Sequence, residues 1–213
     1  MKPLILISQR LWSNAEYPEQ RETLDIRWGA FLNTCGLLPV PVLTETTLSD
    51  YFDLAPAGVL LTGGNDLASL APQDPLNALR DKTEGSLIRL AIERKLPVVG
   101  VCRGMQMLAH HFGAGLEDRG SEHVRKNHAV RVESGTEIGK AYPKDPNVNS
   151  FHRYCVTTVK APMRVAASAS DGTVEAVEVP AQRVFGLMWH PERNEPFRPA
   201  DIQFFKNVFG KGK

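Results

Sequence analysis

Short aliphatic and β-branched runs alternate with amphipathic stretches through the first half of the chain. This alternation is typical of βαβ units, in which helices join parallel strands and cover the faces of their sheet. The runs that predict strands lie at residues 4–7, 38–43, 58–62 and 97–101. We therefore expect an α/β fold, a three-layer sandwich whose central sheet is mainly parallel.

Amphipathic spacing locates helices between these runs. The first helix is predicted from apolar residues spaced i, i+4, i+7 and i+8, at Leu24, Trp28, Phe31 and Leu32. One face of a helix has this spacing, and Gly36 is placed to end it. Two further stripes predict a helix before the fourth strand, at Leu87, Leu90 and Ala91, and a last helix packed on the sheet, at Ile202, Phe205 and Phe209.

After Gly115, in the second half of the chain, the pattern changes to short strand-like runs. Strand-like runs include residues 174–179 and 183–189, and the pair Asp171-Gly172 is a turn signal for a hairpin. This half should be antiparallel or mixed. Because no repeat, low-complexity tract or linker interrupts the chain, we expect residues 1–213 to form one domain.

Charge and composition exclude several classes of function. The 25 Lys and Arg residues nearly balance the 24 Asp and Glu residues, which leaves a formal net charge of +1. Such a balance offers no field for polyanions, so no nucleic-acid or membrane partner is expected. The apolar run at residues 4–7 is too short for a signal peptide or a membrane span. We expect a cytoplasmic protein, and a homodimer is left open.

The three cysteines are Cys35, Cys102 and Cys155, an odd number at wide spacing that fits neither a zinc knuckle nor a disulfide framework. A reducing compartment fits this cysteine usage. Free cysteine is among the most buried residue types, so Cys35 and Cys155 are interpreted as structural. The setting of Cys102 is different and predicts a reactive thiol.

Cys102 stands where an apolar strand runs straight into a helix. This is the pattern of a nucleophile elbow, whose sharp turn crowds the backbone, and glycines two residues to either side, here Gly100 and Gly104, relieve the crowding. Amides at a helix start favour a thiolate. The backbone N–H of Arg103 is placed where an oxyanion would form.

A thiol nucleophile usually needs a base, and six histidines compete for that role. Four are weak candidates, because they lie late in the elbow helix or in a polar stretch: His110, His111, His123 and His128. His190 ends a strand-like run, and Pro191 enforces an extended backbone there. Residues i and i+2 then face the same way, so Glu192 can lie beside the imidazole and fix its tautomer.

A second oxyanion donor is needed as well. Gly63 and Gly64 follow the third predicted strand, and backbone without side chains can approach a ligand closely. A Gly-Gly pair is also an ordinary turn signal, so the elbow is what favours the functional interpretation.

These blocks together resemble the class I glutamine amidotransferase superfamily, and within it the γ-glutamyl hydrolase branch, peptidase family C26. They occur in the family's order: Gly63-Gly64, the Gly-x-Cys-x-Gly-x-Gln segment at residues 100–106, and His190-Pro-Glu192. The resemblance covers nearly the whole chain. It implies a flavodoxin-like α/β sandwich with a nucleophile elbow.

The resemblance also implies roles for individual residues. It implies a triad of Cys102, His190 and Glu192, and an oxyanion hole from the backbone of Arg103 and one of the paired glycines, chiefly Gly64. Gln106 would help to hold the glutamyl group.

Residues 148–152 look like the family's Asn-Ser-x-His element, whose backbone lies near the substrate's α-carboxylate. Ser150, Phe151 and His152 are therefore expected at the substrate. Members of the family often continue with a His-Gln pair, where this chain has Arg153-Tyr154. The role of that pair is left open.

The implied chemistry is acyl transfer to a small-molecule γ-glutamyl substrate. Cys102 attacks the γ-carbonyl, His190 protonates the departing amine, and water activated by His190 hydrolyses the γ-glutamyl thioester. This chemistry requires no metal and no organic cofactor.

The leaving group is expected to meet the polar and aromatic loop at residues 8–22. Ligands of open α/β sheets bind at the carboxyl edge of the strands, where this loop begins. Arg10 could grip a phosphate or phosphoramidate with its forked guanidinium, and Tyr17 is a further contact candidate. The loop resembles the γ-glutamyl-CDP-amidate hydrolases of bacterial capsule phosphoramidate synthesis.

Three alternatives share these blocks. A γ-glutamyl-GABA hydrolase of polyamine breakdown would differ only in its leaving amine. A glutaminase subunit would pass ammonia to a separate synthase partner, and a catalytically dead binding module would leave Cys102 unreactive.

Overall fold

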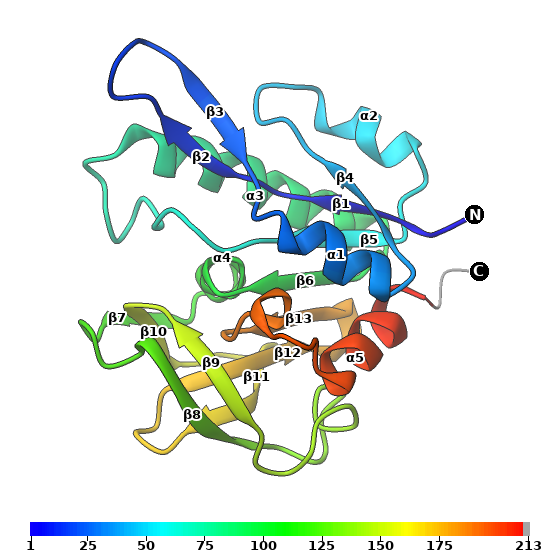
Figure 1. The fold of residues 1–213 in the computed structure, drawn as a ribbon, viewed down its shortest axis with the longest axis vertical. Helices are drawn as coiled ribbons and strands as arrows, with labels where there is room; N and C mark the ends of the chain where they lie inside the picture. Colours follow the sequence, from blue (N-terminus) through cyan, green and yellow to red (C-terminus); the bar gives the residue numbers. More distant parts are fainter. Residues whose placement is uncertain (211–213) are drawn as a thin grey trace.

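The computed structural model describes residues 1–210. Its main sheet runs in the order β4-β1-β5-β6-β13-β12-β11-β8-β9, with β10 and β7 attached beside β12 (Figure 1). The strands of this sheet are β1 (Leu4–Ile7), β4 (Leu38–Pro41), β5 (Gly58–Leu61), β6 (Val98–Val101), β7 (Gly115–Asp118), β8 (Val124–Val132), β9 (Asn147–Phe151), β10 (Tyr154–Thr158), β11 (Arg164–Ala169), β12 (Val174–Val179) and β13 (Val184–Leu187).

The part of the sheet from β4 to β13 is parallel, and the part from β13 to β9 is antiparallel. β13 joins the two parts, because it lies parallel to β6 and antiparallel to β12. The α/β class with a parallel central region is therefore confirmed, as is the antiparallel pairing expected after Gly115. The predicted hairpin is the β11–β12 turn, where Gly172 has φ +85°.

Helices cover both faces of the parallel region (Figure 1). α1 (Arg27–Thr34) and α5 (Pro199–Phe209) contribute to one hydrophobic cluster, and α2 (Leu48–Asp53), α3 (Pro75–Glu93) and α4 (Arg103–His111) contribute to the other. Short 3₁₀ turns, η1 (Pro180–Gln182) and η2 (Pro191–Arg193), flank β13. These two layers with the sheet between them make the predicted sandwich.

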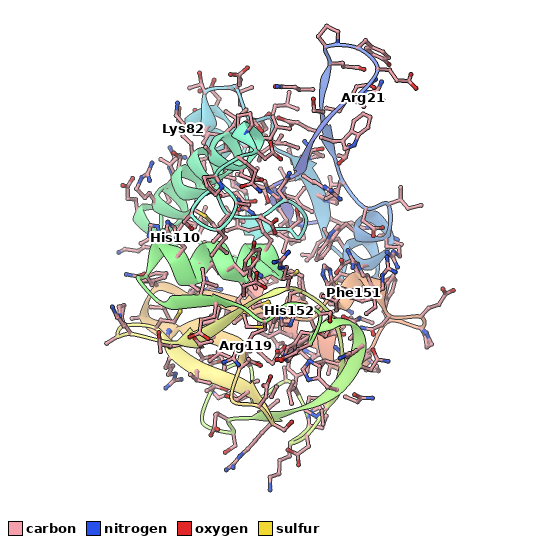
Figure 2. The ribbon with its side chains drawn as sticks, turned by 90° about the vertical axis from the view of Figure 1, so that its left-hand side faces the viewer. Arg21, Lys82, His110, Arg119, Phe151 and His152 are labelled. Atoms are coloured by element: carbon pink, nitrogen blue, oxygen red, sulfur yellow. The ribbon has the colours of Figure 1, made fainter. Side chains whose placement is uncertain are left out.

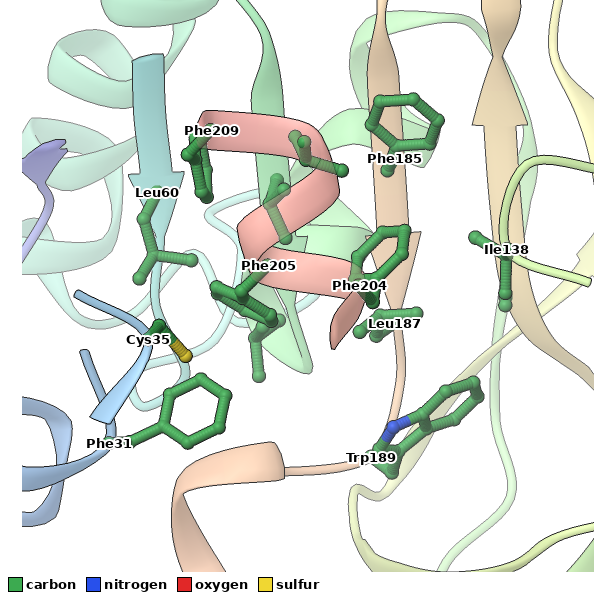
Figure 3. Packing of buried hydrophobic residues seen from close by; sticks show 14 of the residues in the cluster. Phe31, Cys35, Leu60, Ile138, Phe185, Leu187, Trp189, Phe204, Phe205 and Phe209 are labelled. Carbon is green, nitrogen blue, oxygen red and sulfur yellow. The ribbon is translucent and has the colours of Figure 1, made fainter. Parts of the chain in front are cut away.

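The α1/α5 side is rich in aromatic side chains. Phe205 packs edge to face against both Phe31 and Phe204, and these rings lie over Leu60 and Leu187 of the sheet (Figure 3). Edge-to-face pairs add stability beyond the area that they bury. This core fixes β5 and β13 relative to each other, and both strands lead into the site described below.

The predicted strand bounds agree closely with the structure. Residues 4–7 form β1 as expected, whereas the other three predicted strands are one or two residues longer than β4, β5 and β6. The first helix begins at Arg27, later than the apolar stripe that starts at Leu24, and Asp25 just before it accepts the backbone N–H of Arg27 at 3.0 Å. Among the described residues, no helix is long and apolar enough to cross a bilayer.

The loop at residues 8–22 forms a structure of its own. β2 (Arg10–Ser13) and β3 (Gln20–Thr23) pair as an antiparallel hairpin, separate from the main sheet. This hairpin projects from the edge at which β1 ends (Figure 1).

Candidate active site

Three neighbouring strands end at one edge of the sheet and carry the expected reactive residues. Leu61 of β5 is in register with Gly100 of β6, and Val101 of β6 is in register with Leu187 of β13. The segments that follow these strands must therefore meet. A Cβ atom placed on Gly63 would lie 2.9 Å from the His190 ring and 3.6 Å from Cys102 Cβ, so the structure brings these three residues together.

Cys102 occupies a strained backbone position at the start of α4. Its φ of 54° and ψ of −109° lie in a region that side chains rarely adopt, and strain of this kind collects at functional sites. The Cys102 N–H donates to the Leu187 carbonyl at 2.8 Å, which holds the turn against β13. The side chain is 7% exposed. This geometry is the predicted nucleophile elbow.

The two glycines beside Cys102 are needed for close backbone approach. A Cβ on Gly100 would stand 2.5 Å from the Gly104 carbonyl carbon. A Cβ on Gly104 would stand 2.7 Å from the Leu61 carbonyl carbon. Since both obstacles are main chain, neither could move aside, and the sequence interpretation of these glycines is confirmed.

The His190 imidazole is held in one orientation. Its Nδ1 lies 2.6 Å from Glu192 Oε1, and both side chains are buried. The side-chain amide of Asn149 accepts the His190 N–H and donates to the His190 carbonyl, both at 2.8 Å. Asn149 is therefore a positioning residue. It is the first residue of the Asn-Ser-x-His element, but the sequence pattern predicted no role for it. The carboxylate leaves Nε2 as the nitrogen that faces Cys102 and Gly63.

The surroundings of His190 favour its protonated form. Burial alone would lower the pKa of His190, but the Cys102 sulfur and the Glu192 carboxylate outweigh burial and raise that pKa to about 9. An imidazolium beside the sulfur attracts a thiolate, which is the nucleophilic form of cysteine. The proton that a departing amine would need is thus already on the ring at neutral pH.

This shift predicts a pH profile. We expect kcat/KM to fall as the pH rises through about 9, because His190 loses the proton for the leaving amine. In Glu192→Gln the hydrogen bond to Nδ1 can persist while the negative charge is lost, so the pKa of His190 should drop and the alkaline limb should move to lower pH. Kinetics between neutral and alkaline pH, with Glu117→Gln as a surface control, measure this. A limb that stays in place in Glu192→Gln would contradict the assignment.

The Gly63-Gly64 loop is oriented by a buried arginine that sequence reasoning missed. Arg80 of α3 donates to the carbonyls of Thr62, Gly63 and Gly64 at 2.8, 3.0 and 2.9 Å. In a trans peptide the N–H of the next residue points opposite to the carbonyl. The Gly64 N–H is therefore turned away from Arg80, and Gly64 lines the same pocket as Cys102. This orientation suits the expected oxyanion donor.

Arg80 belongs to a buried ionic network below the loop. Its Nε donates to Glu84 at 2.9 Å, and Glu84 also pairs with Arg103 and accepts the Ser8 hydroxyl. Burial lowers the pKa of Arg80 to about 10, which leaves it charged at neutral pH. The signal in the sequence is a polar stripe on α3 at i, i+3, i+4 and i+7: Asn77, Arg80, Asp81 and Glu84. Such a stripe ordinarily indicates a solvent-facing side.

A pocket of about 300 Å³ opens beside Cys102 and includes most of the predicted glutamyl contacts. Its lining includes Gly64, Cys102, Arg103, Gln106, Phe151, His152, Arg153 and Tyr154. Gln106 donates to the Tyr154 carbonyl at 2.8 Å and so ties the elbow helix to this wall. Phe151 and His152 lie side by side in Figure 2.

Two residues of the expected wall are directed elsewhere. The Ser150 hydroxyl donates to the His123 carbonyl at 2.6 Å, and Ser150 is buried and does not line the pocket. Arg153 forms a forked ion pair with Asp118, at 2.8 Å from Nε, and this pair lowers the pKa of Asp118 to about 2. The Arg103 side chain turns inward to Asp81 and Glu84, so its expected contribution is confined to its backbone N–H.

A second pocket, of about 280 Å³, lies on the other side of Gly64. Its lining includes Arg10, Gly63, Gly64, His190 and Arg193, with Leu24 and Trp28 as an apolar part. Arg10 lines both pockets, and a Cβ on Gly64 would collide with its side-chain carbons, so Arg10 lies directly against the glycine loop. Tyr17 lines neither pocket. It is half exposed in the connection between β2 and β3, and its hydroxyl accepts from Arg21 at 2.9 Å.

The other two thiols do not resemble Cys102. Cys35 and Cys155 are buried, and burial raises the pKa of each to about 12. Neither would carry an appreciable thiolate fraction at neutral pH, which agrees with their interpretation as structural cysteines.

The fold and the elbow place the protein in the class I glutamine amidotransferase-like proteins. A glutamine amidotransferase from Thermotoga maritima superposes with a TM-score of 0.69 and covers 99% of this chain and 85% of its own, at 17% identity. The chain belongs to the Peptidase C26 family, whose model matches residues 3–192.

Several relatives carry γ-glutamyl hydrolase names. The "Gamma-glutamyl-CDP-amidate hydrolase" of Campylobacter jejuni is 34% identical over 206 residues, which cover 95% of this chain and 96% of that protein. The "Gamma-glutamyl-gamma-aminobutyrate hydrolase" of Escherichia coli O157:H7 is 33% identical over 135 residues, which cover 54% of this chain and 53% of that protein. The family is thus one of γ-glutamyl amide hydrolases and glutamine amidotransferase-like proteins.

Proposed function

We propose that this protein is a cysteine hydrolase that cleaves a γ-glutamyl amide bond through a γ-glutamyl thioester on Cys102. The observation that carries the proposal is the meeting of Cys102, His190 and the glycine loop at the ends of β6, β13 and β5. A nucleophile, a base with an orienting carboxylate and backbone donors are what acyl transfer requires.

Each group has one task in the proposed reaction. The Cys102 thiolate attacks the γ-carbonyl, and the N–H groups of Arg103 and Gly64 stabilise the oxyanion. The His190 imidazolium gives its proton to the leaving nitrogen as the C–N bond breaks. The neutral imidazole then takes a proton from water, whose oxygen attacks the thioester; the C–S bond breaks, glutamate is released, and the Cys102 thiolate is restored beside the imidazolium. Glu192 holds the imidazole and stabilises its charged form.

The leaving group must lie near His190, which supplies its proton. This requirement favours the second pocket, which His190 and Arg10 both line. In the part of the chain that the structure describes, no carboxylate forms an ion pair with the Arg10 guanidinium. Two carboxylates also line this pocket, but both are already paired: Asp25 with Arg27, and Glu192 with His190 and Arg193. Arg10 is therefore the forked donor that an anion could meet here. An anionic leaving group fits such a pocket better than ammonia does.

We infer that the substrate is γ-glutamyl-CDP-amidate, which would release glutamate and a cytidine diphosphoramidate. The phosphoramidate could accept from the Arg10 guanidinium in this pocket, and the Campylobacter jejuni relative of that name is similar along nearly the whole chain. A γ-glutamyl-GABA substrate is the second candidate, because its leaving carboxylate could also meet Arg10, but the relative of that name matches only about half of the chain.

Mass-spectrometric detection of glutamate and of each amine product tests the proposal. The substrates are γ-glutamyl-CDP-amidate, γ-glutamyl-GABA and glutamine, each with the protein alone. We expect the nucleotide compound to have the highest kcat/KM. Arg10→Ala should raise the KM for the nucleotide compound by about 10-fold or more, because losing one hydrogen bond to a charged group typically weakens binding by at least that factor. Arg21→Ala is the matched control, because Arg21 lies on the same hairpin far from Phe151 and His152 (Figure 2).

Other outcomes would change the proposal in defined ways. Preference for γ-glutamyl-GABA, or equal use of both compounds, would remove the nucleotide assignment and leave the thioester chemistry. Activity on glutamine only would favour a glutaminase subunit with a synthase partner. A protein that cleaves none of the three would contradict the proposed function.

A further inference from the structure

A second cluster of ionisable side chains lies outside the catalytic groups. Three imidazole nitrogens face one buried carboxylate oxygen, Glu175 Oε1: His123 Nδ1 at 3.6 Å, His128 Nε2 at 3.9 Å and His152 Nε2 at 3.5 Å. The four atoms all lie within 4.8 Å of one another. Glu175 is completely buried, and His123 and His152 are 5% and 3% exposed. Sequence reasoning considered His123 and His128 only as weak candidates for a base.

The opposite nitrogen of each ring has an accepting partner. The contacts are His123 Nε2 to Asp171 Oδ2 at 2.8 Å, His152 Nδ1 to the Tyr154 carbonyl at 3.2 Å, and His128 Nδ1 to the Ala129 carbonyl at 3.3 Å. A neutral imidazole has one N–H, and partners that can only accept draw it to their side. The inward nitrogens then present lone pairs.

With three neutral imidazoles, this arrangement lacks a positive centre. The inward nitrogens and both Glu175 oxygens have no hydrogen-bond partner among the residues that the structure describes. Burying a carboxylate without compensation is costly, and lone pairs on three sides raise that cost. A cation among the four atoms would satisfy all of them. Histidines that ligate metals commonly donate their other N–H to a carboxylate or a backbone carbonyl, which is what these three do.

We propose that His123, His128, His152 and Glu175 bind one divalent transition-metal ion, and that this ion is Zn²⁺. Imidazole and carboxylate are zinc ligands, and bonds of about 2.0–2.2 Å in a tetrahedron put the ligand atoms about 3.3–3.6 Å apart. The distances from Glu175 Oε1 to His152 and His123, 3.5 and 3.6 Å, fit this geometry, and the 3.9 Å to His128 is slightly longer. All the ligand atoms lie within 4.8 Å of one another, so the wider pairs would have to contract on binding. Four protein ligands fill a tetrahedron, so the site is of the closed, structural kind.

The four ligands come from separate segments. His123 precedes β8, His128 lies in β8, His152 lies between β9 and β10, and Glu175 lies in β12. His152 also lines the pocket beside Cys102. The ion would therefore tie the wall at residues 150–154 to the sheet. It takes no part in the thioester chemistry, which needs no metal.

Metal binding by the full chain tests the proposal directly. The protein is stripped with a chelator, dialysed, and titrated with Zn²⁺ by calorimetry. Its metal content is then measured by plasma mass spectrometry, and Co²⁺ loading is followed by visible absorption. We expect one Zn²⁺ per chain, a tetrahedral Co²⁺ spectrum and a higher Tm with metal.

A ligand variant and a control locate the ion. His128→Gln is the informative variant, because this ligand is the most exposed of the four, with 22% of its side chain accessible, and its loss is the least disruptive to folding. Removing a residue that only hydrogen-bonds to a metal ligand typically lowers metal affinity by roughly 10–100-fold. Removing the ligand His128 itself should lower zinc affinity by more than that. His110→Gln, at an exposed position of α4, should bind zinc like the wild type. A wild-type chain that binds no Zn²⁺ or Co²⁺, or a His128→Gln variant with unchanged affinity, would overturn the proposal.

Discussion

Cys102→Ala is expected to lower kcat/KM for the γ-glutamyl substrate by at least about 10⁴-fold, because the proposed reaction has no route without the thiolate. The loss should fall mainly on kcat, since the glutamyl pocket and the Arg10 pocket remain. The alanine side chain fits the same elbow, so the Tm should stay close to that of the wild type. Steady-state kinetics with thermal unfolding of the same samples measure both effects.

Cys35→Ala is the matched control for this substitution. It also removes a buried thiol, but one whose pKa burial raises to about 12 and which lies at the end of α1, in the hydrophobic core that α5 shares (Figure 3). It should cost some stability and leave kcat near the wild-type value. Activity that survives in Cys102→Ala would refute the nucleophile.

Arg80→Met should both destabilise the protein and slow catalysis. The substitution removes the donors to three consecutive carbonyls and one of the two arginines paired with Glu84. Breaking a buried ion pair on one side typically costs about 3–5 kcal/mol in the free energy of unfolding. The Gly64 N–H would also lose its fixed direction, and losing one oxyanion donor typically costs about 10²–10³-fold in kcat.

The control and the readout separate these two effects. Arg89→Met changes an exposed arginine of the same helix and should leave both quantities near wild type. Kinetics well below the Tm of each variant report on loop geometry alone, and Arg80→Lys should recover stability better than kcat, because an ammonium lacks the fork that spans the carbonyls. Normal kcat in folded Arg80→Met would contradict the positioning role.

The elbow was predictable because its requirements are local. Gly100, Cys102 and Gly104 stand in one short segment, and the crowding that selects the glycines comes from the turn itself. The parallel strands were also predictable from short apolar runs. His190 could be chosen among the six histidines because Pro191 and Glu192 fix its local geometry.

Long-range contacts were less predictable. The pairing of β13 between β6 and β12 brings residues 98–101 and 184–187 together, and no local pattern specifies that register. Arg80 lies on a helix whose polar stripe would ordinarily face solvent, and only the tertiary structure buries it against the glycine loop. In the histidine cluster only His123 and His128 have a spacing found in zinc motifs, and His152 and Glu175 join them from distant positions that the sequence pattern does not connect.

The sequence also could not show how the β2–β3 hairpin separates the two predicted contacts of the leaving group. Arg10 and Tyr17 were grouped because they share one loop, but β2–β3 pairing separates them. Arg10 at the start of β2 lies against Gly64, while Tyr17 beyond the strand pairs with Arg21. The predicted role of Arg10 gains support from this geometry, and that of Tyr17 stays a prediction.

The most direct test of the central claim is the mass of the intact protein during turnover. Wild-type protein is mixed with the γ-glutamyl substrate, quenched in acid within the first turnovers, and digested to locate any adduct. The account predicts an added γ-glutamyl group on the peptide that contains Cys102, which disappears as the substrate is consumed and is absent from Cys102→Ala. Rapid turnover with no adduct, or an adduct on Cys35 or Cys155, would contradict it.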